Sequence, residues 1–438
     1  MKVLTRLLFL GIVAVSLLLA ACGGPKGPVT VKFMSSDADL PAAFVDKFNK
    51  ENPDKITIVR TEPDYTKMVA EAASGNASDL INIGEGSDLA YYVPRGLFKD
   101  ITPYLQKSKI LKMSDIDPLG NVNYRFDGKE FGKGPWYGLT KDYNNIGAIT
   151  YNKEMFKAAG IPFLSETEPI TYDELYQLAK KRTKKDKSGK VTTWGYDMIT
   201  GWWKFLASDM AYMSGLNVFK DADKAVMNDD PKMNAIWKYF AQYFVDGIVP
   251  NVKNPAPSWA GANFQSDRVA ILQAGYWFGA QLRSNPGFEQ KYGWAPTPVM
   301  VKGGPRVTNT LGATGVVMYA KTKVPDQAFK VLEWYMGGDY GVERAKTGWG
   351  IPPLKSLEPL LPEANAYDKS RKVIALDDAK YFKPWQTTGW TTSPAWDPIW
   401  TKNIESLVKG EINMDTFISN WYSGLDKLFA DGKAELGK

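Results

Sequence analysis

The sequence predicts an α/β fold built on doubly wound parallel sheets, and two observations carry that prediction. Apolar segments with strand periodicity alternate with segments of helical periodicity from residue 29 to residue 83. Such alternation is typical of parallel sheets with right-handed crossovers. The chain has 438 residues, of which 44% are hydrophobic, so it can supply core for two or three domains.

The first predicted elements alternate between strand and helix. Val29, Val31 and Phe33 alternate with polar side chains, which is typical of a half-buried strand. The expected order is strand 29–34, a helix capped by Asp39, strand 56–59, helix 65–73 and strand 80–83. Ligands of doubly wound sheets sit beyond the carboxyl ends of the strands, so the loops 35–39 and 84–88 are expected to hold a site.

The later part of the chain is largely helical in pattern. Thr171 and Glu174 stand three residues apart, which is the spacing of a reciprocal helix cap, ahead of an apolar stripe. Helices are expected over 171–183, 232–248, 325–336 and 414–429.

The N-terminus has the charge order of a secretory signal. Lys2 and Arg6 precede an apolar run that is too short for a transmembrane helix and ends at Cys22, the only cysteine. A leucine, two alanines and Cys22 together resemble the lipobox of bacterial lipoproteins. The resemblance implies a signal peptide over 1–21, acyl chains on Cys22 that hold the protein at a membrane, and a tether over 22–28. A buried core thiol is the alternative, but the adjacent Gly-Gly-Pro offers it no core.

Composition excludes several kinds of chemistry. The chain contains no histidine, so it cannot form a Ser-His-Asp triad or a histidine-ligated zinc site. It has no phosphate-binding loop, and 84–90 matches two of the three glycines of a dinucleotide fingerprint, so neither cofactor nor metal is expected. The formal charge of +6 is concentrated at 180–190, which carries seven basic residues and one acid. We expect a solvated helix end there and no nucleic-acid binding, with contact to a membrane or partner as the alternative.

Tryptophan points to binding, because fifteen tryptophans occur alongside 22 tyrosines. Trp237, Trp334 and Trp421 follow helical spacing and are expected in the core. Six others lie in segments without helical period: Trp202, Trp203, Trp277, Trp349, Trp390 and Trp396. An aromatic ring can stack on the C–H face of a sugar, while amide and carboxylate groups bond its hydroxyls. Sugar contact and packing between domains are both open for these six.

Five segments occur in an order that resembles a known family: "DLINIGEGSDLAYYVPRGLFKDIT" (79–102), "PWYGLTKDYNNIGAITYNKEMFKAAGI" (135–161), "ITYDELYQLAKKRT", "FQSDRVAILQAGYW" (264–277) and "GATGVVMYAKTKVPDQAFKVLEWYM" (312–336). They resemble the extracellular solute-binding proteins of bacterial ABC importers, in the family that includes maltose- and oligosaccharide-binding proteins. The resemblance implies a two-lobed periplasmic-binding-protein fold of type II, with doubly wound sheets and a ligand cleft between the lobes. Lobe 1 would comprise 29–144 and 313–350, and lobe 2 would comprise 147–310 and 353–438.

The resemblance also implies which residues contact the ligand. The positions it suggests are Ser36 and Asp37 after the first strand, Glu85 after the third, Asn145 at the crossover, and Trp202, Trp203, Trp277, Trp349 and Trp390. Trp396 matches as well as Trp390, and we favour Trp390.

The same resemblance implies a carbohydrate ligand, the permease subunits of an ABC importer as partners, and a monomer. The protein would be lipid-anchored at the extracellular face of the cell membrane, facing the periplasm if the cell has two membranes, and would bind without cofactor or catalysis. One alternative keeps the fold but binds a peptide, polyamine or organic anion. Another is a membrane-tethered glycoside hydrolase that uses two of the 48 carboxylates.

Overall fold

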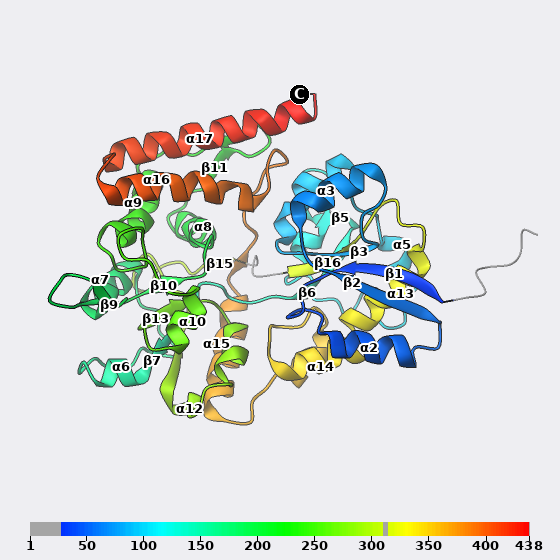
Figure 1. The fold of residues 1–438 in the computed structure, drawn as a ribbon, viewed down its shortest axis with the longest axis horizontal. Coiled ribbons are helices and arrows are strands. Elements are labelled where there is room, and N and C mark those ends of the chain that lie inside the picture. Colours follow the sequence, from blue (N-terminus) through cyan, green and yellow to red (C-terminus); the bar gives the residue numbers. More distant parts are fainter. Residues whose placement is uncertain (1–27, 310–313, 438) are drawn as a thin grey trace, which may run out of the picture.

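The computed structural model describes residues 28–309 and 314–437, which form two lobes, each with its own sheet and core (Figure 1). The expected signal peptide, Cys22 and the tether up to residue 27 lie outside the described residues. Within the described part, no helix is long and apolar enough to cross a membrane.

Lobe 1 is built on a five-stranded sheet with helices on both faces. Its order is β2-β1-β3-β16-β6, with β1 at Val29–Met34, β2 at Ile56–Thr61, β3 at Leu80–Ile83, β16 at Thr314–Met318 and β6 at Gly138–Asp142. β1 pairs in parallel with β2 and β3, as predicted, whereas β16 runs antiparallel to β3 and β6. One core contains α2 (Ala42–Glu51), α13 (Pro325–Met336) and α14 (Asp339–Thr347), and the other contains α3 (Tyr65–Ser74).

The prediction that Asp39 caps the first helix is wrong. α2 begins at Ala42 with Pro41 as its N-cap, and it is the Asp37 carboxylate that accepts a hydrogen bond from the Ala42 amide at 3.3 Å. The Asp39 carboxylate instead accepts a hydrogen bond from Ser36 Oγ at 2.9 Å and pairs with Lys141 Nζ at 2.9 Å. The Asp39 carboxylate therefore lies at the strand ends of the sheet, where it neutralises the buried ammonium group of Lys141.

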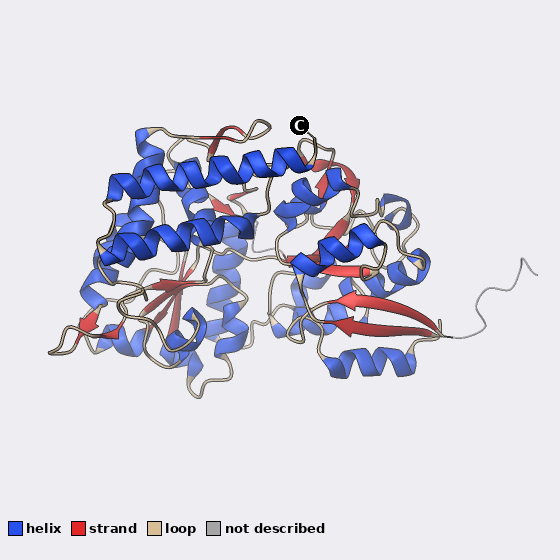
Figure 2. Cartoon of the chain, turned by 45° about the horizontal axis from the view of Figure 1, so that its top comes forward, coloured by secondary structure: helices blue, strands red, loops and turns tan. Residues whose placement is uncertain are grey.

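Lobe 2 combines a smaller sheet with a large helical core. The sheet order is β10-β13-β7-β14, with β10 at Asp197–Met198, β13 at Ile271–Gln273, β7 at Ile149–Asn152 and β14 at Tyr292–Ala295. Its main helices are α7 (Tyr172–Arg182), α8 (Trp203–Met213), α9 (Pro231–Val245), α15 (Ala366–Ala379), α16 (Asp397–Lys409) and α17 (Met414–Glu435). The reciprocal cap predicted at Thr171 and Glu174 is confirmed at the start of α7. α17 runs along the lobe, and its C-terminal end reaches lobe 1 (Figure 2).

The lobe 2 core is rich in tryptophan. Trp237 and Trp421 are buried there, as their helical spacing predicted. Trp334, the third tryptophan expected in a core, is partly buried against the core of lobe 1.

The remaining elements are short: α4 Leu89–Tyr92, α5 Thr102–Leu105, β4 Arg125–Phe126, β5 Phe131–Trp136, α6 Lys153–Lys157, β8 Lys184–Lys185, β9 Val191–Thr193, β11 Phe219–Asp221, β12 Val226–Met227, α10 Ala260–Gln265, α11 Phe278–Leu282, α12 Phe288–Lys291, β15 Thr308–Asn309 and β17 Phe382–Lys383. Five 3-10 turns join them: η1 Gly86–Asp88, η2 Val93–Arg95, η3 Val122–Tyr124, η4 Lys355–Leu360 and η5 Ser393–Trp396. The basic stretch 180–190 spans the end of α7 and the β8–β9 hairpin and is mostly exposed, as expected of a solvated helix end.

Three connections join the lobes. The first runs from β6 to β7, the second from β15 to β16, and the third follows α14; Tyr143 and Ile351 pair across the first and third as an antiparallel bridge. Leu354 and Leu357, which follow Ile351, pack in a core of lobe 1.

Candidate functional site

A cavity of about 220 Å³ lies between the lobes beside the connections. We call it the inner cavity, and its walls are Asp39, Gly84, Glu85, Lys141, Asp142, Asn144, Trp202, Trp277, Thr314 and Trp349. The polar residues come mainly from the strand ends of lobe 1, and two of the three tryptophans precede helices of lobe 2. The site thus lies where doubly wound sheets place their ligands, beyond the strand ends.

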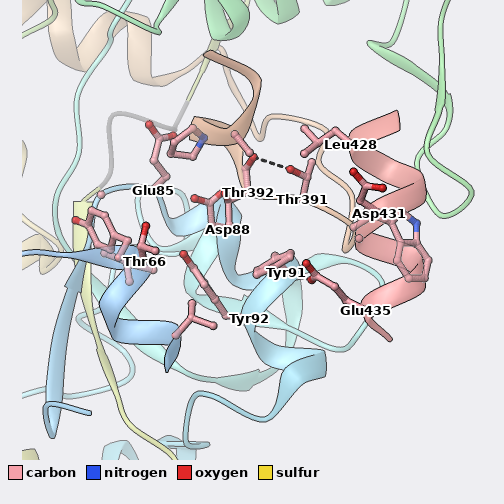
Figure 3. A pocket seen from close by; sticks show the side chains of 18 residues that line it. Thr66, Glu85, Asp88, Tyr91, Tyr92, Thr391, Thr392, Leu428, Asp431 and Glu435 are labelled. Atoms are coloured by element: carbon pink, nitrogen blue, oxygen red, sulfur yellow. Dashed lines mark hydrogen bonds between the residues drawn. The ribbon is translucent and has the colours of Figure 1, made fainter. Parts of the chain in front are cut away.

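A second cavity of about 560 Å³ adjoins the first and shares Gly84 and Glu85 with it. We call it the outer cavity. Lobe 1 contributes Tyr65, Glu85, Asp88, Tyr91 and Tyr92, and lobe 2 contributes Trp390, Thr391, Thr392, Asp431 and Glu435 (Figure 3). Small-molecule sites usually occupy about 300–1,000 Å³, and the volume of the outer cavity falls within that range. The inner cavity adds to the space available to a ligand.

A buried ion network forms the floor of the inner cavity. Lys141 Nζ lies 2.6 Å from Asp142 Oδ2 and 2.9 Å from Asp39 Oδ1, and Arg344 Nε lies 3.8 Å from Asp142 Oδ2. Burial raises the pKa of Asp39, but the ammonium group of Lys141 outweighs this effect and holds the pKa below its usual 3.8. Burial likewise opposes the charge of Lys141, yet Asp142 and Asp39 raise its pKa. The floor is thus charged, near neutral in sum, and rigidly paired.

Aromatic rings form the facing wall. The ring centroids of Trp277 and Trp349 are 5.7 Å apart, with their planes inclined by 54°. Trp259 stacks on Trp277 at 6.4 Å with nearly parallel planes. All three tryptophans that line the inner cavity, the third being Trp202, are partly buried, so each keeps ring surface for a ligand.

Two carboxylates stand where the cavities meet. Glu85 lines both cavities, and Asp88 Oδ1 accepts a hydrogen bond from the Ser393 amide of lobe 2 at 2.8 Å. Burial raises the pKa of Glu85 to about 8 against the attraction of Lys204, and it raises that of Asp88 to about 7 against hydrogen bonds from Ser393 and the attraction of Lys204. Lys204 itself donates to Asp397 at 2.7 Å.

Several residues suggested by sequence do line these cavities. Glu85, Trp202, Trp277 and Trp349 line the inner cavity, and Glu85 and Trp390 line the outer one. Trp396, the alternative to Trp390, is 1% exposed in the core of lobe 2. Of these two tryptophans, only Trp390 lies at the wall of a described cavity.

Trp203 has a different position from its neighbour Trp202. It is 4% exposed and stacks on Trp400, with ring centroids 3.9 Å apart and planes inclined by 14°. The cause is α8, which is buried on nearly every face and turns Trp203 into the core of lobe 2. Ligand contact is not assigned to Trp203, which is a core residue.

Three polar residues suggested by sequence also stand outside the lining of the inner cavity. Asn145 donates to Asp378 Oδ2 at 2.8 Å and thereby holds the first connection, and it is the adjacent Asn144 that lines the cavity. Ser36 bonds Asp39, and Asp37 is an exposed partner of an arginine. These side chains position the site or lie at the surface.

Sequence reasoning missed Lys141, Asp142, Asn144 and Thr314, which line the inner cavity. Asp39 and Asp88 also line the site, and they fall in the two strand-end loops that were expected to hold it. The position of a loop directly after a predicted strand therefore indicated correctly where the site lies. Residue type alone did not show which residues of that loop would line the cavity.

Two lobes with separate sheets, three connections and a polar and aromatic cleft define a hinged solute-binding protein. The chain belongs to the bacterial extracellular solute-binding protein family, whose model matches residues 43–372. This finding confirms the family resemblance drawn from the sequence.

Relatives and solved structures agree with this assignment. The chain is 25% identical over 369 residues to the diacetylchitobiose binding protein DasA of Streptomyces coelicolor, which covers 80% of this chain and 82% of the relative. An ABC substrate-binding protein from Listeria monocytogenes in complex with cycloalternan superposes with a TM-score of 0.76 and 18% identity, over 93% of this chain and 100% of that one. A solute-binding protein from Thermotoga lettingae bound with α-D-tagatose gives a TM-score of 0.72 and 17% identity, over 92% and 100%. The structures confirm the two-lobed fold.

Proposed function

We propose that this protein captures a carbohydrate, with an oligosaccharide as the favoured form, between its lobes and delivers it to the permease of an ABC importer. The observation that carries the proposal is the inner cavity, where Trp202, Trp277 and Trp349 face a floor of paired charges. A pyranose presents a flat C–H face and a rim of hydroxyl groups, so it requires rings on one side and hydrogen-bonding groups around it.

The adjoining outer cavity supports a ligand longer than one sugar unit. Tyr65, Tyr91 and Trp390 provide further rings within it, and Glu85 links it to the inner cavity. Similar proteins point the same way, since they include a diacetylchitobiose binding protein and solved structures with cycloalternan and mannobiose bound.

The proposed mechanism is binding without chemistry. The lobes swing about their three connections, and closure desolvates the hydrogen bonds to the ligand and forms the surface that the permease recognises. We further propose that the mature chain begins at a lipid-modified Cys22, is monomeric, and acts at the extracellular face of the membrane. A Cys22→Ser variant would then be released from membrane vesicles while keeping its ligand affinity, and a variant that stays membrane-bound would contradict the anchor.

The function is tested by thermal unfolding of a soluble chain starting at Gly24, scanned against mono- and oligosaccharides, peptides, polyamines and organic anions. A ligand at 100 times its dissociation constant stabilises the folded protein by about 2.7 kcal/mol, which moves the midpoint visibly. We expect one saccharide series to shift the midpoint and to be recovered intact. A shift produced only by a non-sugar would replace carbohydrate by that cargo, and recovery of cleaved sugar would favour the glycoside hydrolase.

A further inference from the structure

We infer that the junction of the two cavities binds a positively charged amino group, so that the solute is a carbohydrate carrying a free amine. The inference rests on the proposed function, because it assumes that the cleft holds a saccharide. It specifies further that this saccharide is positively charged. It is carried by the distribution of ionic partners around the outer cavity.

The carboxylates at the rim of the outer cavity already have partners. Glu435 Oε2 lies 3.2 Å from Arg95 Nη2, and Asp431 Oδ2 lies 2.8 Å from Lys427 Nζ. Both carboxylate side chains are more than half exposed, so water also solvates them. None of the described residues that line the outer cavity is a lysine or an arginine.

The two carboxylates at the junction lack such compensation. Lys204 attracts both Glu85 and Asp88, but its ammonium group already donates to Asp397 at 2.7 Å. Three carboxylates therefore share one ammonium group. On the other side, Lys141 is held by the two carboxylates of the inner floor, so it is not free to neutralise this pair.

The local geometry leaves acceptor capacity at the junction. The Glu85 Oε2 atom is buried and accepts no hydrogen bond from the described residues. Asp88 is 5% exposed and receives a backbone N–H from Ser393 on Oδ1. In Figure 3 both side chains project from lobe 1 toward the lobe 2 segment that carries Thr391 and Thr392. An ammonium group placed between them would donate charge-assisted hydrogen bonds to both.

Protonation and aromatic surroundings agree with a cationic guest. Burial raises the pKa of both carboxyl groups, so burying them without a cationic partner favours their protonated forms. A bound ammonium group supplies the positive charge instead. Tyr65 offers a ring face nearby, and such a face stacks on a sugar and attracts a cation, whereas the rings of Tyr91 and Trp390 already lie beside Arg95 and Lys433.

The test is calorimetric titration with three β-1,4-linked disaccharides that differ only at the C2 substituent: glucosamine with its free amine, N-acetylglucosamine, and glucose. In slightly acidic buffer, where sugar amines are protonated, we expect the amine disaccharide to bind at least about tenfold more tightly than either neutral one. Repeating the titration in buffers of different ionisation enthalpy should show fewer protons taken up with the amine.

Variants then locate the effect. Glu85→Gln and Asp88→Asn keep the size of the side chains and should each abolish most of the preference for the amine, measured as the ratio of its affinity to that of the neutral disaccharides. Asp415→Asn removes a negative charge whose side chain is 87% exposed on the outside of lobe 2, and it should leave the preference unchanged. Two junction variants guard against misfolding of either one, and their unfolding midpoints are compared with the wild type.

The outcomes separate the two proposals. Equal or tighter binding of a neutral disaccharide, or an unchanged preference in both junction variants, overturns the inference and leaves carbohydrate capture standing. Binding of spermidine with no binding of any saccharide overturns both the inference and the proposed function.

Discussion

Arg95 of lobe 1 bonds three acceptors of lobe 2, and its removal should favour opening of the cleft. Its Nη1 donates to Gly389 O at 3.0 Å, and its Nη2 donates to Gly432 O at 3.3 Å and to Glu435 Oε2 at 3.2 Å. All three acceptors belong to lobe 2, and Gly432 lies in the last turn of α17, where a cation is favoured by the helix dipole.

The expected magnitude follows from these bonds. The two bonds to carbonyl groups involve a largely buried guanidinium group and contribute about 1–1.5 kcal/mol each, whereas the exposed Glu435 adds about 0–1 kcal/mol. Arg95→Ala should therefore destabilise the closed form by about 2–4 kcal/mol and weaken ligand binding by up to about 30- to 850-fold. The free energy of unfolding of the lobes should change less, because within lobe 1 the variant loses only the bond to Tyr91 O at 2.8 Å and the contact with the Tyr91 ring.

Titration calorimetry measures the affinity, and small-angle scattering measures whether the ligand-bound variant is more open. Arg125→Ala is the matched control, since Arg125 donates only within its own hairpin, to Gly134 O at 3.2 Å through Nη2. Wild-type affinity and compactness in Arg95→Ala would refute the assignment of this residue to closure.

Three further predictions separate binding, hinge and pH effects. Trp277→Ala should weaken saccharide binding about tenfold with little loss of stability, whereas Trp203→Ala should cost about 3–5 kcal/mol of unfolding free energy by cavity formation, as denaturant titration would show. Asp378→Ala should cost about 2–4 kcal/mol because Asn145 and Thr297 lose a buried acceptor while Arg306 keeps its ion pair with Asp377, and calorimetry should report the loss in the ligand-free protein. The lowered pKa of Asp39 contributes stability that is present above its ordinary 3.8 and lost as the pH falls through the lower folded value, so urea midpoints should drop in this acid range less in Asp39→Asn than in wild type.

The sequence predicted what is local in the fold. Strands β1 and β3 have the predicted bounds because alternation and apolar runs are set within a few residues. The adjacent Trp202 and Trp203 could not be told apart, because α8 is buried on almost all sides and has no polar stripe to fix its phase. Lys141 was missed for another reason: lysine is rarely buried, and its two carboxylate partners come from the strand-end loop at Asp39 and from Asp142.

The unpredicted contacts of α15 explain how a swing of the lobes can be confined. Asp378 on this helix accepts hydrogen bonds from Asn145 of the first connection, and its backbone carbonyl accepts one from Thr308, which precedes the second. Arg371 on the same helix donates to Gly348 O of the third connection at 3.1 Å. Because this one helix of lobe 2 bonds the first and third connections, we expect the backbone rotations of opening to fall on the lobe 1 side of these bonds, next to the residues that line the inner cavity. A ligand in that cavity therefore contacts the segments that move, which is how occupancy of the cleft can bias closure.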